Sequence, residues 1–226
     1  MGGMGERRYR IMYEYVEKSE YAPIRKELEQ IIKRTQIEMR KNYGLTFQFH
    51  LIGSGKRHLI TRLKGGNSGY DFDYNLIISP PENGYCYDAK SIKQDFMNAL
   101  KIALKGTKYS FPKDSTSSIT IKVIDKNKKK IQHSCDFAVI YYGRNNNNYG
   151  YYYLKNNKAQ QSYQFVFRTL SSRIEEKLHR IIKDGGWFRI KEEYQLLKSI
   201  NEGCRKCSFS LYVETVNNVY NQMYLQ

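Results

Sequence analysis

Three aspartates are the residues of this chain whose types and spacing could carry out chemistry. Asp71 and Asp73 are two positions apart, in the segment Tyr-Asp-Phe-Asp-Tyr, and Asp136 comes later, directly before an apolar run. Side chains two apart on a strand leave the same face. Two carboxylates on one face repel each other unless a cation lies between them. If the strand of Asp136 lies beside that of Asp71 and Asp73, three carboxylates can hold two Mg²⁺ ions.

A glycine-serine pair, Gly53–Ser54, follows directly on a segment in which apolar and polar residues alternate. Backbone amides at a strand-to-helix junction can bind phosphates, and glycine lets the backbone approach them closely. Ser54 could donate one further hydrogen bond. Lys56 and Arg57 come next and could steer a triphosphate, although basic residues at such positions are equally often simply exposed.

Each of these features is weak alone, because Gly-Ser occurs in many turns and a strand aspartate can cap a loop. Aspartate is disfavoured in strands, however, and a strand-borne acid needs a cation or another partner. Together they favour phosphate transfer, with Asp136 assisting removal of a proton from the attacking hydroxyl. His50 and His133 lie on expected strands nearby, and we interpret them as polar-face residues rather than catalysts.

The periodicity of apolar residues predicts the elements that must position these groups. Alternation predicts strands, and helical spacing predicts helices. The expected strands are 45–51, 71–79, 118–124 and 131–142, with a tyrosine-rich edge strand over 150–154. The expected helices are 6–18, 23–41, 56–63 and 89–105, with three more after Phe167. Between them, 126–130 is expected to be a hairpin turn and 145–148 a loop.

This order of elements predicts an α+β fold, in which helices flank a mixed β-sheet core. We expect the core and its N-terminal helices to occupy residues 1–165, and a C-terminal helical part to occupy residues 166–226. No internal repeat is evident, and the sequence has no long linker between these parts.

The amino-acid composition indicates which binding partners and which cellular compartment to expect. The net charge of +16 favours polyanions such as nucleic acid or nucleotide triphosphates, although a biased composition is the alternative. No run of about eighteen apolar residues occurs, so no membrane partner is expected. Four cysteines are few for a disulfide scaffold and fit a reducing cytoplasm. Cys204 and Cys207 form a C-x-x-C without a second pair, which favours helix-end thiols over a zinc site.

The order of the motifs resembles that of the DNA polymerase β-like nucleotidyltransferase superfamily. There a Gly-Ser begins a helix, an acidic pair follows on the next strand, and a third acid lies on a later strand. Residues 45–142 are most similar to the template-independent branch, which holds poly(A) polymerase, oligoadenylate synthase and the bacterial cyclic-nucleotide synthases. The segment between Ser54 and Asp71 is longer than the compact family form, and His58 and Leu59 stand where small residues are usual.

The resemblance implies a mixed-sheet nucleotidyltransferase core, dependence on Mg²⁺ (or Mn²⁺) and an NTP donor, with ATP the expected one. It assigns Asp71, Asp73 and Asp136 as metal ligands, and Gly53 and Ser54 as phosphate contacts. The C-terminal helices of such enzymes close the other wall of the cleft. Base or ribose contacts are therefore expected there, from Tyr194, Lys198 and Tyr212.

The leading hypothesis is an enzyme that moves NMP from an NTP to a hydroxyl acceptor and releases pyrophosphate. RNA, tRNA or a second nucleotide is the expected acceptor, because a basic surface would repel a cationic aminoglycoside. A small-molecule nucleotidyltransferase of the aminoglycoside type remains an alternative. A non-catalytic nucleotide- or RNA-binding module on the same fold is another, against which the presence of all three acids argues.

Overall fold

The structure is a computed structural model that describes residues 12–82, 85–170, 173–201 and 206–225 of the 226-residue chain. The chain divides into two compact units. The larger unit consists of Val16–Ile60 and Asn67–Leu170. The smaller unit is formed by the described parts of Met1–Tyr15, Thr61–Gly66 and Ser171–Gln226.

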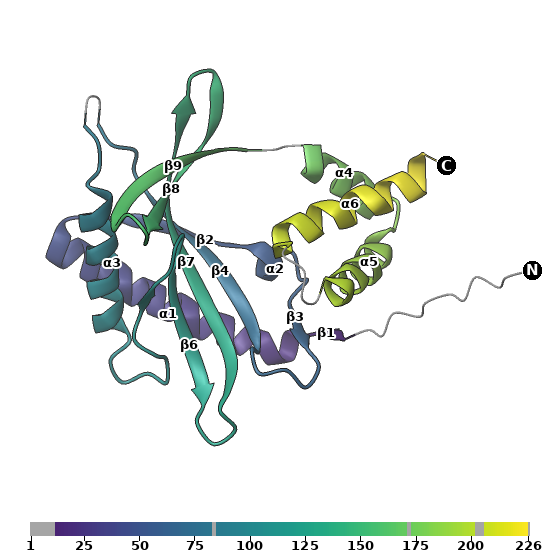
Figure 1. Ribbon diagram of the computed structural model, residues 1–226, viewed down its shortest axis with the longest axis horizontal. Coiled ribbons are helices and arrows are strands. Elements are labelled where there is room, and N and C mark those ends of the chain that lie inside the picture. Colours follow the sequence, from purple (N-terminus) through teal and green to yellow (C-terminus); the bar gives the residue numbers. More distant parts are fainter. Residues whose placement is uncertain (1–11, 83–84, 171–172, 202–205, 226) are drawn as a thin grey trace, which may run out of the picture. The chain divides into compact units, whose positions relative to one another are not determined.

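The larger unit is built on a seven-stranded mixed sheet (Figure 1). Its main path runs in the order β2 (Phe47–Ile52), β4 (Tyr70–Ile78), β7 (Lys130–Asn145), β6 (Ile119–Asp125), β5 (Lys113–Asp114). From β7 the sheet continues through β8 (Asn148–Asn157) to β9 (Ser162–Thr169). Strands β4 and β7 are parallel, and the other pairs are antiparallel. The predicted α+β fold with a mixed sheet is thus confirmed.

Two helices, α1 (Lys18–Tyr43) and α3 (Ala89–Ala103), pack against one face of this sheet. Side chains of both helices share one hydrophobic core with the inward side chains of the strands. On β4, Phe72 and Tyr74 are fully buried in this core. Because side chains alternate along a strand, Asp71 and Asp73 must lie on the opposite face. The core therefore fixes which face carries the acids.

The smaller unit combines a two-stranded sheet with the C-terminal helices. Its strands are β1 (Tyr13–Tyr15) and β3 (Thr61–Leu63), which pair antiparallel. Its helices are α4 (Arg173–Lys183), α5 (Trp187–Ile200) and α6 (Ser208–Tyr224). Helix α6 contacts both α4 and α5, and α5 contacts β1. The helices expected after residue 166 therefore share a unit with two short strands.

Two of the helices predicted before residue 64 were wrong, and a third begins earlier than predicted. The expected helix over 6–18 falls partly outside the described residues, and its described part contains β1. The next helix begins at Lys18, and Pro23 lies inside it rather than at its first turn. The expected helix over 56–63 is only the single turn α2 (Gly53–Lys56), followed by β3. His58 has a left-handed backbone (φ 56°) that ends the helix, and the next residue, Leu59, turns inward and is buried.

The region after β7 also differs from expectation. The asparagine run forms a tight turn in which Asn145 pairs with Asn148, rather than a longer loop. Strand β8 is not an edge strand, because β9 pairs along it. Strand β9 reaches Thr169, where helical spacing had been expected from Phe167 onward.

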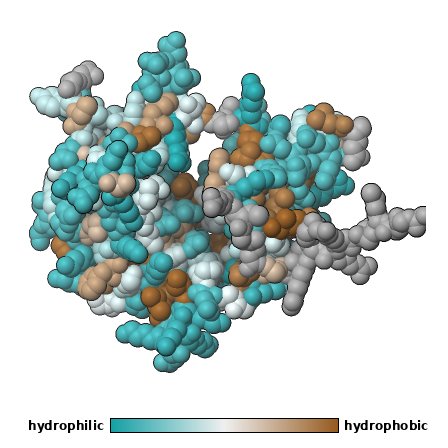
Figure 2. Space-filling model, in the orientation of Figure 1, coloured by the Kyte–Doolittle hydropathy of each residue, from teal (hydrophilic) through white to brown (hydrophobic). Residues whose placement is uncertain are grey.

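No helix within the described ranges is long and apolar enough to span a membrane. On the face drawn in Figure 2, hydrophilic side chains predominate and apolar ones form separate patches.

Candidate active site

The register of two parallel strands places the three acids on one face of the sheet. Asp73 on β4 is directly opposite Asp136 on β7, and Asp71 is opposite Ser134. Residues in register on neighbouring strands point to the same face, as do residues two apart on one strand. Asp71, Asp73 and Asp136 therefore share the face that α1 and α3 leave uncovered.

The carboxylates of Asp71 and Asp136 are held by hydroxyl groups. Ser134 Oγ donates to Asp71 Oδ1. Asp136 Oδ1 accepts from Thr120 Oγ1 and from Ser118 Oγ, the latter at 3.1 Å. Within the described ranges, no three His, Cys, Asp or Glu side chains are grouped closely enough to hold a metal ion. The strands thus bring the three acids onto one face, and hydroxyl groups hold one carboxylate oxygen each of Asp71 and Asp136.

Gly53 is in direct contact with Asp73. Its backbone is left-handed (φ 61°), a conformation that favours glycine. A Cβ at this position would overlap Asp73 Oδ2 and would lie 3.2 Å from Cγ of the same carboxylate. Any other residue would therefore strain the backbone and displace the acid. The glycine-serine corner and the acidic pair, 20 residues apart in sequence, meet at this point.

Helix α2 forms the corner itself. Ile52, which precedes it, is opposite Asp73 in the β2–β4 register. Arg57 Nη1 donates to the carbonyl oxygen of Gly53 (3.1 Å) and so stabilises the turn. The side chain of Lys56 is exposed, and no described group hydrogen-bonds to Ser54 Oγ. Ser54 and Lys56 are therefore available to a ligand.

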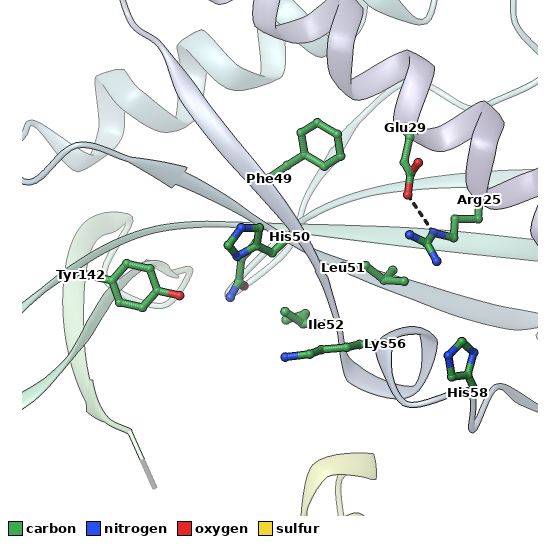
Figure 3. Close-up of a pocket in the computed structure, with 10 residues that line it drawn as sticks. Arg25, Glu29, Phe49, His50, Leu51, Ile52, Lys56, His58 and Tyr142 are labelled. Atoms are coloured by element: carbon green, nitrogen blue, oxygen red, sulfur yellow. Dashed lines mark hydrogen bonds and ion pairs between the residues drawn. The ribbon is translucent and has the colours of Figure 1, made fainter. Parts of the chain in front are cut away.

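A pocket of about 520 Å³ lies along edge strand β2, next to this corner (Figure 3). Its lining includes His50, Lys56, Asn75 and Tyr142, and an ion pair between Arg25 and Glu29 at 2.8 Å. In Figure 3 the hydroxyl of Tyr142 and the ammonium of Lys56 point into the same space.

Three polar side chains of this pocket, those of His50, Asn75 and Lys56, are available to bind a ligand. His50 and Asn75 are opposite each other in the β2–β4 register, on the same face as Asp73. Among the described residues, none hydrogen-bonds to the side chains of His50, Asn75 or Lys56. Three polar groups and a tyrosine ring thus line this pocket, and Asn75 connects it to the acids because it is two positions from Asp73 on β4.

The two histidines named from the sequence have different surroundings. His50 is exposed at the pocket. His133 is buried on the core face of β7, with Nε2 3.1 Å from the hydroxyl oxygen of Tyr109. Burial, helped by the charge of Lys108, lowers the pKa of His133 to about 4. His133 is therefore a neutral core residue and not part of the site.

The three C-terminal residues predicted to contact the nucleotide all belong to the smaller unit. Tyr194 and Tyr212 are buried within it, only 2% and 3% exposed. The ammonium of Lys198 is 3.2 Å from Ser208 Oγ and 5.0 Å from the ring centre of Tyr13. The contacts were expected because the C-terminal helices of the family that this chain resembles close the cleft; the two tyrosines are buried here, and a role at the nucleotide stays a prediction.

The C-x-x-C pair is only partly described. Cys204 lies outside the described residues. Cys207 precedes α6, and its exposed thiol is 3.3 Å from Ser210 Oγ.

Several residues around the acids were missed from the sequence: Ser118, Thr120, Ser134 and Asn75. The signal for most of them was the same period of two that located the acids. Ser134 and Asn75 are each two positions from an aspartate on the same strand. Hydroxyl and amide residues two positions from an aspartate on a strand can therefore be predicted to lie on the same face as that aspartate.

No protein-family model matches this sequence, and no curated protein matches it. Solved structures do share its fold. One is the cyclic dinucleotide synthase CdnE of Elizabethkingia meningoseptica, with GTP and Apcpp (14% identity, 86% of this chain and 69% of that chain, TM-score 0.55). Another is the cyclic AMP-GMP synthase DncV of Vibrio cholerae (13% identity, 90% and 68%, TM-score 0.56).

A CD-NTase of Bradyrhizobium diazoefficiens, CdnG, aligns over 72% of this chain but only 42% of its own length (15% identity, TM-score 0.46). The chain therefore spans about two thirds or less of these proteins. At such identities the likeness concerns the fold. The chain has the nucleotidyltransferase fold of these synthases, as the resemblance of the motifs implied.

Proposed function

We propose that this chain is a metal-dependent nucleotidyltransferase that transfers NMP from an NTP, with ATP the expected donor, to the hydroxyl of a second nucleotide. Pyrophosphate is released. The observation that carries the proposal is the meeting of three elements: Asp73 lies opposite Asp136 on parallel strands and is touched by Gly53. The fold shared with nucleotide-using synthases supports it.

The chemistry of the donors fits Mg²⁺ or Mn²⁺, and the three side chains would have to draw together to share an ion, because they are not grouped as a metal site in this structure. Asp71, Asp73 and Asp136 offer hard carboxylate oxygens on one face of two neighbouring strands. When bound, such ions neutralise phosphate charge and lower the pKa of an attacking hydroxyl. Asp136 is then the group that accepts the proton of that hydroxyl.

The corner at Gly53 and Ser54 is the proposed triphosphate site. Helix α2 is a single turn, so its dipole is small, and binding must come mainly from individual donors. These donors are the backbone amides of the turn, the uncommitted hydroxyl of Ser54 and the exposed ammonium of Lys56. Arg57 contributes indirectly, because its guanidinium holds the Gly53 carbonyl.

The pocket on β2 is the proposed acceptor site. An amide such as that of Asn75 can pair with a base edge, and the rings of His50 and Tyr142 can stack on it. A volume of about 520 Å³ suits one small ligand rather than a nucleic-acid helix. The charge of +16 attracts nucleotides and RNA alike, so the pocket rather than the charge favours a nucleotide. A structure of the Vibrio cholerae enzyme holds the linear intermediate 5′ pppA(3′,5′)pG.

The test is incubation with α-labelled ATP, GTP, CTP and UTP, singly and in pairs, with Mg²⁺ or with EDTA. Products are treated with phosphatase and separated. We expect Mg²⁺-dependent release of pyrophosphate and a phosphatase-resistant nucleotide product, which an acceptor that lacks both the 2′- and the 3′-hydroxyl should not form. Label that appears only on added RNA would overturn the nucleotide acceptor. Nucleotide binding without any turnover would instead indicate the non-catalytic module.

A further inference from the structure

Two hydroxyl groups hold the carboxylate of Asp136. Its Oδ1 accepts from both Ser118 Oγ and Thr120 Oγ1. No described residue hydrogen-bonds to its Oδ2. Two donors on one oxygen fix the rotation of the carboxylate and leave the other oxygen to face outward. We call Ser118 and Thr120 the hydroxyl clamp.

The clamp residues are themselves placed by the sheet and by the turn before it. Thr120 is directly opposite Asp136 in the β6–β7 register and is 9% exposed. Ser115 Oγ lies 2.8 Å from Thr120 Oγ1. Ser118 immediately precedes β6, and its carbonyl accepts from the Ser115 amide at 3.0 Å. The orientation of the clamp therefore depends on the turn over 115–118.

A buried lysine of α3 holds this turn from the core. The Lys93 ammonium donates to the carbonyl oxygens of Ser118 (2.8 Å) and Ser115 (3.3 Å) and pairs with Asp114 Oδ1 at 3.0 Å. Lys93 is 2% exposed. A buried ammonium is costly unless oxygens surround it, and all three of these oxygens come from residues 114–118. Burial lowers the pKa of Lys93, against the opposing effect of Asp114.

Asp114 is in turn tied to the sheet. Its Oδ2 accepts from Asn156 Nδ2 and from the Tyr163 hydroxyl, each at 2.7 Å. The segment is therefore connected to α3 on one side and to β8 and β9 on the other.

We propose that Ser118 and Thr120 are positioning residues for Asp136, and that Lys93 fixes them from the core. The proposal rests on the proposed function, because it assumes that Asp136 binds metal or accepts a proton. The clamp holds Oδ1 so that Oδ2 is presented at a constant position and angle. A small displacement of a reacting group slows the reaction strongly. Loss of the hydroxyl clamp should therefore lower the rate more than it weakens substrate binding.

The test combines Thr120→Val, which keeps the β-branched shape, with Ser118→Ala. We expect kcat at saturating NTP to fall about 10- to 100-fold. The Mg²⁺ concentration for half-maximal rate should rise, while KM for NTP changes by less than about twofold. A second double variant, Thr120→Ser with Ser118→Ala, keeps the hydroxyl at position 120. It should recover most of the rate that the first double variant loses. A first double variant with the kcat and Mg²⁺ requirement of the wild type would overturn the clamp.

Thr35→Val is the matched control. Thr35 is also a buried threonine, but its hydroxyl donates to the Ile31 carbonyl within α1 (2.9 Å). It should lose comparable stability without a change in kcat. If the clamp residues were merely structural, they would behave as this control does.

The role of Lys93 is tested with Lys93→Met and Asp114→Asn together, which removes both charges of the ion pair and leaves neither of them unpaired. We expect the same fall in kcat as in the clamp variant. A folded double variant with the wild-type kcat would overturn the role of Lys93.

Mn²⁺ binding, followed by electron paramagnetic resonance, separates this proposal from the proposed function. Wild-type protein that neither turns over NTPs nor binds Mn²⁺ contradicts the proposed function. Active wild-type protein with an unaffected clamp variant contradicts the clamp alone.

Discussion

At the scale of single residues, the contact between Gly53 and Asp73 links the two halves of the site. The sequence predicted that glycine at 53 lets the backbone approach something closely. The structure identifies a carboxylate at that point, in addition to any phosphate. Sequence spacing alone could not show this, because the contact depends on the β2–β4 register.

Gly53→Ala should therefore affect both stability and activity. A left-handed alanine costs about 1–2 kcal/mol of unfolding free energy, and its Cβ displaces the Asp73 carboxylate. We expect that loss in urea unfolding, and at least a tenfold loss of kcat, on the order of 1.4 kcal/mol. Gly106→Ala is the control, because Gly106 is also left-handed (φ 76°) with nothing within 4 Å of its Cβ. Equal activity loss in both variants would contradict the steric explanation.

Asp73→Asn should abolish transfer while the fold is retained. The site loses a metal ligand, and we expect a fall of at least about 100-fold, or 2.7 kcal/mol of transition-state stabilisation. Without Mg²⁺ the melting temperature should stay the same or rise, because repulsion between the carboxylates is relieved. Pyrophosphate release and thermal unfolding measure the two effects. Full activity would refute the assignment of this residue.

Asn75→Ala tests the acceptor pocket. Loss of one hydrogen bond costs about 1 kcal/mol, so KM for the acceptor should rise roughly fivefold with kcat little changed. Steady-state kinetics with the donor saturating measure this. Asn98, a partly exposed residue of α3 whose Oδ1 accepts from Gln94 Nε2 at 3.0 Å, provides the control Asn98→Ala. An unchanged KM for the acceptor in Asn75→Ala would contradict the proposal that this pocket binds the acceptor.

At the scale of elements, the long strands were predictable and the short ones were not. In strands β4, β6 and β7 apolar and polar residues alternate clearly, and each strand pairs along its length with neighbouring strands. The sequence pattern and the observed pairing therefore agree. Strands β1 and β3 are three residues each and pair across about 48 positions of sequence, which no local pattern reports. For β9, the alternation of Tyr163, Phe165 and Phe167 was the signal, and helical spacing nearby obscured it.

The burial of His133 in β7 gives the fold a pH dependence. Its pKa is lowered to about 4 in the folded chain. Between pH 6.5 and pH 4 this histidine is therefore mostly protonated in the unfolded chain and mostly neutral in the folded chain. The unfolding free energy should thus fall as pH is lowered, by roughly 2 kcal/mol between pH 6.5 and pH 5. Urea unfolding at several pH values measures this slope. His133→Phe should flatten it and the exposed His50→Gln should not; an unchanged slope in His133→Phe would contradict the account.

At the scale of the whole molecule, charge and length limit what the fold implies. The net charge of +16 is compatible with several anionic partners, and the pocket rather than the charge points to a nucleotide. The chain spans 69% and 68% of the two synthases whose fold it shares, so substrates of those proteins cannot simply be transferred to it.

Binding of Mg²⁺ and NTP should stabilise the molecule by mass action. At a ligand concentration of 100 times Kd the gain is about 2.7 kcal/mol, which raises the melting temperature by roughly 5–10 °C. Differential scanning fluorimetry with ATP, GTP, CTP and UTP, each with Mg²⁺ or EDTA, measures the shift. The shift should depend on Mg²⁺ and should shrink in Asp73→Asn. A flat titration with all four nucleotides would count against the site.

The most direct measurement is a crystal structure with Mn²⁺ and a non-hydrolysable ATP analogue, with data collected at the manganese edge. We expect anomalous peaks that mark manganese ions bound to the carboxylates of Asp71, Asp73 and Asp136. The triphosphate of the analogue should contact Gly53 and Ser54. Manganese bound elsewhere, or a nucleotide that leaves these carboxylates without metal, would contradict this account.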